Sequence, residues 1–64
     1  MILYIAKNKN EEVYLHTEKP IYEDELGGWY SDPDTIDITG QFSEFDNISY
    51  KDECIKVEIN IKRI

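Results

Sequence analysis

The chain has 64 residues, one cysteine and a net charge of −7. A domain of this size buries only about 60% of the surface that its unfolded chain exposes, so we expect a small core and no deep active-site cleft. A lone cysteine excludes an intrachain disulfide, which favours a reducing, cytoplasmic setting. We expect neither a membrane span nor a signal peptide, because the apolar runs are too short. The composition predicts one globular domain over residues 1–64.

Acidic residues are concentrated in the middle of the chain. Between Pro20 and Tyr50 there are eight acids and no Lys or Arg, whereas residues 1–10 and 54–64 each carry a net charge of +2. Proteins bind phosphate groups through Lys and Arg, so this block argues against direct contact with nucleic acid. Anionic membranes are disfavoured for the same reason.

The N-terminal segment predicts a β-hairpin. Residues 2–7 and 12–17 are rich in β-forming residues, and the KNKN segment between them supplies a turn. Asn8 and Asn10 tolerate the positive φ angles that such turns use. Pro20 is expected to end the second strand, because proline cannot donate to a central ladder.

The second strand of this hairpin is expected to have two different faces. Val13 and Leu15 alternate with Glu12, Tyr14 and His16. Because successive side chains of a strand point to opposite faces, the first pair is predicted to lie on one face and the other three on the opposite, polar face. His16 is therefore interpreted as a surface residue.

The middle of the chain predicts two further strands. Residues 22–28 (YEDELGG) are expected to form a loop, in which the two glycines permit unusual dihedral angles. Residues 28–31 (GWYS) and 35–39 (TIDIT) follow as strands, separated by an SDPD turn. Ile36 and Ile38 are predicted to face inward.

The last third predicts one helical turn and one strand. The QFSEF segment places Phe42 and Phe45 three residues apart, on one side of such a turn. In residues 54–62, apolar Ile and Val alternate with polar residues, the pattern of a strand with one buried face. Together these elements predict a mainly β fold: a small antiparallel sheet of about five short strands, curled or barrel-like, with at most one short helical turn.

Motifs for catalysis or metal binding are absent from the sequence. The acids Asp32, Asp34 and Asp37 do not have the spacing of a calcium-binding loop. His16 and Cys54 are the only nitrogen and thiol ligands, too few for structural zinc. No nucleophile motif or phosphate-binding glycine loop is present, so we expect neither an enzyme nor a cofactor. A weak cation site at the Asp-rich turn, supporting a metal-dependent activity, is a minor alternative.

Surface recognition is the function class that these residues favour. Tyr and Trp recur as anchors at protein interfaces, and acids steer a basic partner into contact. The competing interpretation is that the acids only solubilise the protein, with Trp29 in the core. The residues predicted to bind a partner are Tyr22, Glu23, Asp24, Glu25, Tyr30, Asp32, Asp34, Asp37, Glu44 and Asp46.

The segment YIAKNKNEEVYLHTEKP, followed by GGWY and an acidic second half, resembles small phage and prophage accessory proteins of unknown function. The resemblance covers about the first half of the chain. Among small acidic proteins of this kind, anti-CRISPR and other anti-defence inhibitors recur, and several are similar to DNA in their charge layout. The resemblance implies a phage-encoded inhibitor in the host cytoplasm, and it transfers no site residues.

These observations lead to two main hypotheses. In the first, the acidic segment acts as a DNA mimic and binds a basic, nucleic-acid-binding host protein, for example a CRISPR effector nuclease. In the second, the protein is a phage structural or assembly protein that pairs with itself, or with another protein, through an edge strand. Lys7, Lys9, Lys62 and Arg63 lie near the two ends, where they could equally protect such edges.

Overall fold

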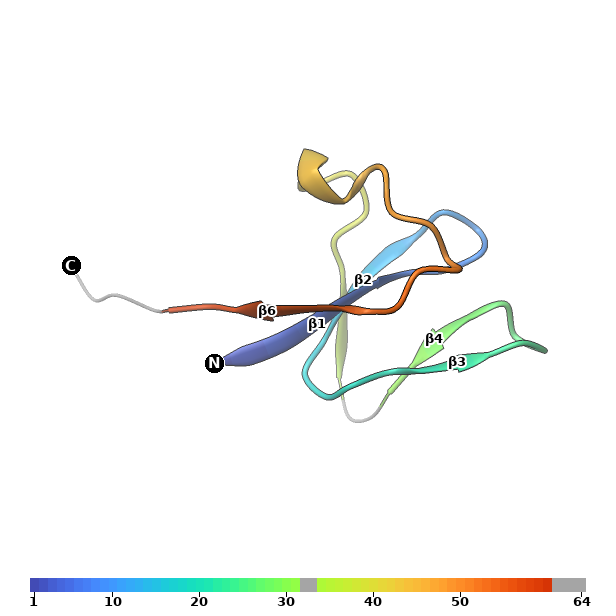
Figure 1. Cartoon of the computed structure of the whole chain (residues 1–64), viewed down its shortest axis with the longest axis horizontal. Helices are drawn as coiled ribbons and strands as arrows, with labels where there is room; N and C mark the ends of the chain where they lie inside the picture. The colour runs from blue at the N-terminus through green and yellow to red at the C-terminus, as the bar shows by residue number, and fades with distance from the viewer. Residues whose placement is uncertain (32–33, 61–64) are drawn as a thin grey trace.

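The computed structural model describes residues 1–31 and 34–60, and these residues form two antiparallel sheets (Figure 1). The larger sheet has the strand order β5-β2-β1-β6, and the smaller one is the hairpin of β3 and β4. The predicted mainly β, antiparallel fold is confirmed. The elements are β1 (Ile2–Lys7), β2 (Val13–His16), β3 (Ile21–Glu23), β4 (Gly28–Tyr30), β5 (Thr35–Asp37), the 3₁₀ turn η1 (Ser43–Phe45) and β6 (Ile55–Glu58).

Strand β1 is the centre of the larger sheet, because it pairs with both β2 and β6. Ile5 lies opposite Leu15 on one side and opposite Ile55 on the other. Alternation along the strands gives the sheet two faces. We call the face that carries Ile5 the core face. The opposite face, which carries Ala6, Tyr14 and His16 and is covered by the β3–β4 hairpin, is the hairpin face.

The hydrophobic core lies on the core face. Ile5, Val13 and Ile38 form its buried cluster, with 4%, 5% and 8% of their surface exposed. Phe45 and Ile48, from the segment that contains η1, pack against this cluster. Figure 1 shows η1 on one side of the four-stranded sheet and the hairpin on the other. The sheet is therefore covered on both sides by short segments.

The two outer parts of the chain fold as predicted. The N-terminal hairpin forms, and β6 pairs antiparallel with β1 at the edge of the sheet. The main chains of Met1 and Ile59 exchange two further hydrogen bonds, of 2.8 and 3.1 Å, so the pairing continues beyond Glu58. The last residues of the predicted strand, 61 and 62, lie outside the described residues. Phe42, which precedes η1, and Phe45 also agree with the prediction, since their ring centroids lie 6.2 Å apart.

The turn of the first hairpin differs from the prediction. The residue with positive φ is Glu11, at 76°, rather than Asn8 or Asn10. The Asn8 carbonyl accepts a hydrogen bond from the Glu11 N–H, and the Asn10 side chain accepts one from the Glu12 N–H at 3.0 Å. The asparagines thus stabilise the turn through hydrogen bonds, and the next residue adopts the left-handed conformation.

The prediction of a loop over residues 22–28 was wrong in its first part. Ile21–Glu23 forms β3, in which Tyr22 lies opposite Trp29 of β4. Glu23 closes the connecting turn, because its carbonyl accepts the Gly27 N–H at 2.9 Å, and Gly27 has a φ of 68°. The described strands therefore number six and lie in two open sheets rather than in one curled or barrel-like sheet.

Ile36 was also predicted wrongly, whereas Ile38 is buried as expected. Ile36 is 58% exposed although it lies opposite Leu15 on the core face. It belongs to β5, an edge strand, so no strand lies beyond it. Ile38 extends the ladder, since its N–H donates to the Val13 carbonyl, and it joins the core cluster. In the part of the chain that the structure describes, no helix has the length and apolar character to cross a membrane.

We predict that Ile5→Ala lowers the free energy of unfolding by about 2–5 kcal/mol, because it leaves a cavity beneath the central strand. A chain of this length has a total stability of only about 3–10 kcal/mol, so the variant is expected to be partly unfolded at 25 °C. Ile36→Ala is the matched control, with an expected change within about 0.5 kcal/mol. Urea unfolding followed by tryptophan fluorescence measures both values. Equal losses in the two variants would contradict the assignment of the core.

Candidate functional site

Two hydrogen bonds dock the β3–β4 hairpin onto the larger sheet. The Trp29 N–H donates to Oδ1 of Asn8 at 2.7 Å, and the Lys9 N–H donates to the Gly27 carbonyl at 2.9 Å. Asn8 is only 8% exposed. A Cβ atom at Gly28 would lie 2.7 Å from the Asn8 side chain, so the close approach requires glycine there. The β3–β4 hairpin, which is distant from β1 in sequence, is therefore held against the C-terminal end of β1.

His16, predicted to be exposed, is the most buried large side chain of the described residues, with 1% of its surface exposed. It does lie on the polar face of β2, but the β3–β4 hairpin and Ser31 cover it there. Its Nδ1 lies 2.8 Å from Oγ of Ser31, which follows β4. Burial lowers the pKa of His16, so the imidazole is neutral at pH 7.

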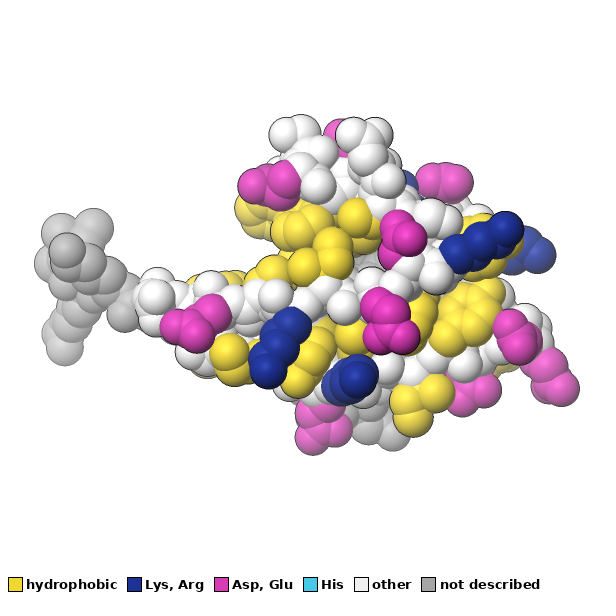
Figure 2. All heavy atoms as spheres, in the orientation of Figure 1, with side chains coloured by type: hydrophobic (Ala, Val, Ile, Leu, Met, Phe, Trp, Pro, Cys, Tyr) yellow, Lys and Arg dark blue, Asp and Glu magenta, His cyan; other side chains and the backbone are white. Residues whose placement is uncertain are grey.

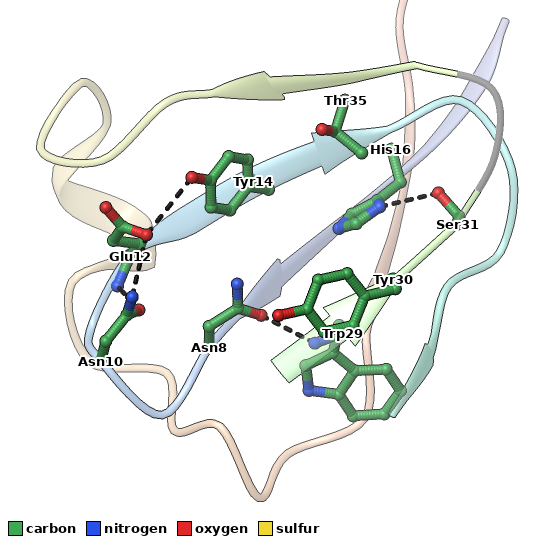
Figure 3. Close-up of a pocket in the computed structure, with 9 residues that line it drawn as sticks. All are labelled: Asn8, Asn10, Glu12, Tyr14, His16, Trp29, Tyr30, Ser31 and Thr35. Carbon is green, nitrogen blue, oxygen red and sulfur yellow. Dashed lines mark hydrogen bonds between the residues drawn. The ribbon is translucent and has the colours of Figure 1, made fainter. Parts of the chain in front are cut away.

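A polar cavity of about 270 Å³ lies between the hairpin face of the sheet and β4 (Figure 3). Nε2 of His16 is buried and has no hydrogen-bond partner among the described residues. A buried polar atom left in this condition costs about 1–3 kcal/mol. The residues that line the cavity are Asn8, Asn10, Glu12, Tyr14, His16, Trp29, Tyr30, Ser31 and Thr35.

The Glu12 carboxylate gives the outer end of this cavity a negative charge. Its Oε1 accepts hydrogen bonds from Nδ2 of Asn10, at 2.9 Å, and from the Tyr14 hydroxyl, at 3.3 Å. Desolvation raises the pKa of Tyr14, and the charges of Glu12 and Asp37 raise it further. Asp37 lies opposite Tyr14 in β5, where hydrogen bonding by the side chain and backbone N–H of Thr39 lowers its own pKa.

A cluster of three aromatic rings connects the hairpin to the loop that precedes β6. Tyr22 and Trp29 pack edge to face with ring centroids 5.4 Å apart, and Tyr22 stacks on Tyr50 at 6.3 Å. Nε1 of Trp29 donates to the Tyr50 carbonyl at 3.1 Å. Trp29 is half-buried in this cluster and does not belong to the core on the other face, where the sequence placed it.

The predicted partner-binding residues fall into separate groups. Tyr22, Glu23, Asp24, Glu25 and Tyr30 belong to the hairpin, Asp34 and Asp37 lie in or next to β5, and Glu44 and Asp46 lie in or next to η1. Asp32 lies outside the described residues. The hairpin and η1 cover opposite faces of the sheet, so their acids do not form one cluster. Figure 2 shows Asp and Glu side chains spread around one view of the molecule, with Lys side chains between several of them.

The structure gives no support for a metal centre within residues 1–31 and 34–60. No three His, Cys, Asp or Glu side chains in these ranges are arranged to hold an ion. Cys54 is half-buried and has a free thiol.

The residues that sequence reasoning missed are Asn8 and His16. Asn8 was interpreted only as a turn residue, yet its side chain docks the hairpin. The alternation of the first strand places Asn8 on the face opposite Ile5, which is a signal that its side chain points away from the core. No local signal indicates the burial of His16.

Comparison with protein-family models, curated proteins and solved structures found no match.

The lowered pKa of His16 predicts that stability falls as the pH is lowered through about 6.5, the ordinary value that applies to the unfolded chain. Below that value His16 binds a proton more readily in the unfolded state than in the folded state, so protonation favours unfolding. Urea unfolding between pH 7.5 and 5 measures the loss, and His16→Gln, which removes the only histidine, should remove this component.

The titration of the His16 ring, followed by NMR, tests the same prediction without a variant. The folded-state pKa should lie below about 6.5, the value for an unperturbed histidine. A folded-state pKa at or above this value would contradict the burial argument.

Proposed function

We propose that this protein is an acidic protein-binding module whose β3–β4 hairpin docks onto a basic surface of a nucleic-acid-binding protein. The observation that carries the proposal is the joint placement of aromatic and acidic side chains on one docked hairpin. Glu23, Asp24 and Glu25 lie at or next to the tip and are exposed, and Tyr30, which is 45% exposed, lies opposite Ile21 at the other end of the same hairpin.

The hairpin has two properties that favour binding. The hydrogen bonds to Asn8 and Lys9 and the packing of Tyr22 on Tyr50 hold it in one position, which reduces the entropy lost on association. The exposed carboxylates at its tip attract a basic partner, and Tyr30 offers an amphipathic ring as an anchor. Carboxylates placed this way would compete with phosphates for Lys and Arg side chains of the partner.

The resemblance to phage and prophage accessory proteins suggests a narrower form of the proposal. A module that occupies the nucleic-acid groove of a host protein would act as an inhibitor, and a CRISPR effector nuclease is one such target. The acids lie on both sides of the sheet, so a partner that surrounds the module could contact the hairpin and η1 together, whereas a flat partner would contact one of them.

Charge reversal at the hairpin tip tests this proposal. The probes are purified basic DNA-binding proteins, including CRISPR effector nucleases with and without guide RNA. We expect binding that weakens as salt is raised and that duplex DNA competes away. The triple variant Glu23→Lys, Asp24→Lys, Glu25→Lys should weaken binding at least about tenfold, measured by calorimetry.

A second variant, Glu53→Lys and Glu58→Lys, makes two thirds of the same change in net charge at exposed positions outside the hairpin, and it keeps Asp52, whose carboxylate accepts the Ser49 N–H. It should retain most of the affinity. Equal weakening in both variants would show that only net charge matters, and binding that is insensitive to salt would contradict the electrostatic mechanism.

A second candidate function, pairing through an edge strand, is favoured by the exposed apolar residues of the core face. Ile36 on β5 is 58% exposed, Phe42 is 50% exposed, and Ile59, next to β6, is 39% exposed. Strands β5 and β6 are the two edges of the larger sheet, and an unpaired edge can accept another strand.

Light scattering at several protein concentrations distinguishes this second candidate. Self-association would give a dimer mass that falls to the monomer mass when Ile59 is replaced by Lys. A monomer at all concentrations in the millimolar range would exclude pairing between copies of this chain.

A further inference from the structure

The cavity on the hairpin face has one closed end and one charged end. His16 lies at the closed end, held by Ser31, and Glu12 lies at the other (Figure 3). The rings of Tyr14, from β2, and Tyr30, from β4, form walls on either side of the space between them. Both strands are held in register by the larger sheet and the docked hairpin, so the walls are fixed by the fold.

Nε2 of His16 is the feature that calls for a ligand. Only 1% of the surface of His16 is exposed. Its free ring nitrogen points into the cavity in Figure 3. When the proton of the neutral ring lies on Nδ1 and is donated to Ser31, Nε2 carries a lone pair. This nitrogen then accepts a hydrogen bond from a group that enters the cavity.

The lining favours a positively charged group. It contains no Lys or Arg among the described residues, and it offers acceptor oxygens from Glu12, Tyr14, Tyr30 and Thr35. Asp37 lies opposite Tyr14 and adds a second negative charge close to the cavity. The lining also contains amide donors: the position of the Asn8 amide nitrogen is fixed because Oδ1 accepts the Trp29 N–H, and the Asn10 amide nitrogen already donates to Glu12.

We propose that the cavity binds the guanidinium group of an arginine side chain from the basic partner. The assignment rests on the proposed function. A guanidinium is planar, so it can stack against tyrosine rings, and its several N–H groups can donate to Nε2 of His16 and to the tyrosine oxygens. The Glu12 carboxylate supplies the opposite charge. A lysine ammonium is a compact, strongly hydrated charge and matches this flat, multi-acceptor lining less well.

An NMR titration with small model compounds tests the assignment on the intact protein. The probes are the Nα-acetyl methylamides of arginine, lysine and citrulline, the last being a neutral analogue with the shape of arginine. We expect saturable shifts of the Trp29 backbone amide and of the His16 Nε2 resonance with the arginine compound. Affinity for the lysine compound should be several-fold lower, and the citrulline compound should produce no saturable shift.

Two results in this titration would overturn the assignment. Equal binding of citrulline would mean that the Asn8 amide and His16 recognise a neutral amide and not a cation. Shifts confined to residues outside the cavity would mean that arginine binds at surface carboxylates and that water serves the buried nitrogen.

Glu12→Gln tests the charge at the entrance without removing the polar side chain that Asn10 and Tyr14 bond. It should weaken binding of the arginine compound at least about fivefold, the size of effect expected when a hydrogen bond between charged partners becomes one to a neutral group. Glu58→Gln, an exposed acid on β6, is the matched control and should leave binding unchanged. An unchanged affinity in Glu12→Gln would contradict the assignment.

Binding to the whole partner separates this inference from the proposed function. If the charge-reversed hairpin tip loses affinity for the basic partner while Glu12→Gln does not, the proposed function stands and the arginine assignment fails. If neither set of variants affects binding of the partner, but the arginine compound still binds in the cavity, the proposed function fails instead.

Discussion

The hydrogen bond from the Trp29 N–H to the buried Asn8 side chain is the constraint on which the rest of the candidate site depends. It joins two sheets that share no strand, and its 2.7 Å length reflects a close approach that Gly28 permits. A buried amide oxygen without a donor would be unfavourable, so this hydrogen bond stabilises the docked position of the hairpin. The docked hairpin in turn shields the hydrogen bond from water. The larger sheet can thus bury polar residues on the face opposite its core.

Docking has two consequences at once. On the inner side, the hairpin covers His16 and encloses the cavity between β2 and β4. On the outer side, it brings Trp29 and Tyr22 against Tyr50, so the loop before β6 is held by aromatic packing and by the Trp29 indole. The hairpin therefore acts as the second layer of a domain that is too short to form a second full sheet. Its carboxylates point to the solvent from a hairpin whose position is fixed by these contacts.

The sequence predicted the elements whose signal is local. The alternation of Ile and Val in β6 and the β-forming residues of β1 and β2 identify strands without reference to the rest of the chain. His16 was misassigned because its exposure depends on Ser31 and the hairpin, which are distant in sequence. Ile36 was misassigned because alternation gives the face of a strand but not whether anything covers an edge. Strand β3 was missed because Glu23 and the two acids that follow it indicate a loop, and the pairing of Tyr22 with Trp29 outweighs that preference.

The negative net charge of the chain affects whether the exposed apolar residues contact another copy of the chain or a basic protein. Two free edges and exposed Ile36 and Phe42 would favour association between copies, yet each copy carries a net charge of −7. Copies that approach one another repel, whereas a basic surface is attracted over about 8–10 Å at moderate salt. The same carboxylates that oppose self-pairing therefore favour a basic partner, and they leave the apolar edges available to strengthen that contact once it forms. This physical asymmetry is why we rank binding to a basic protein above self-association.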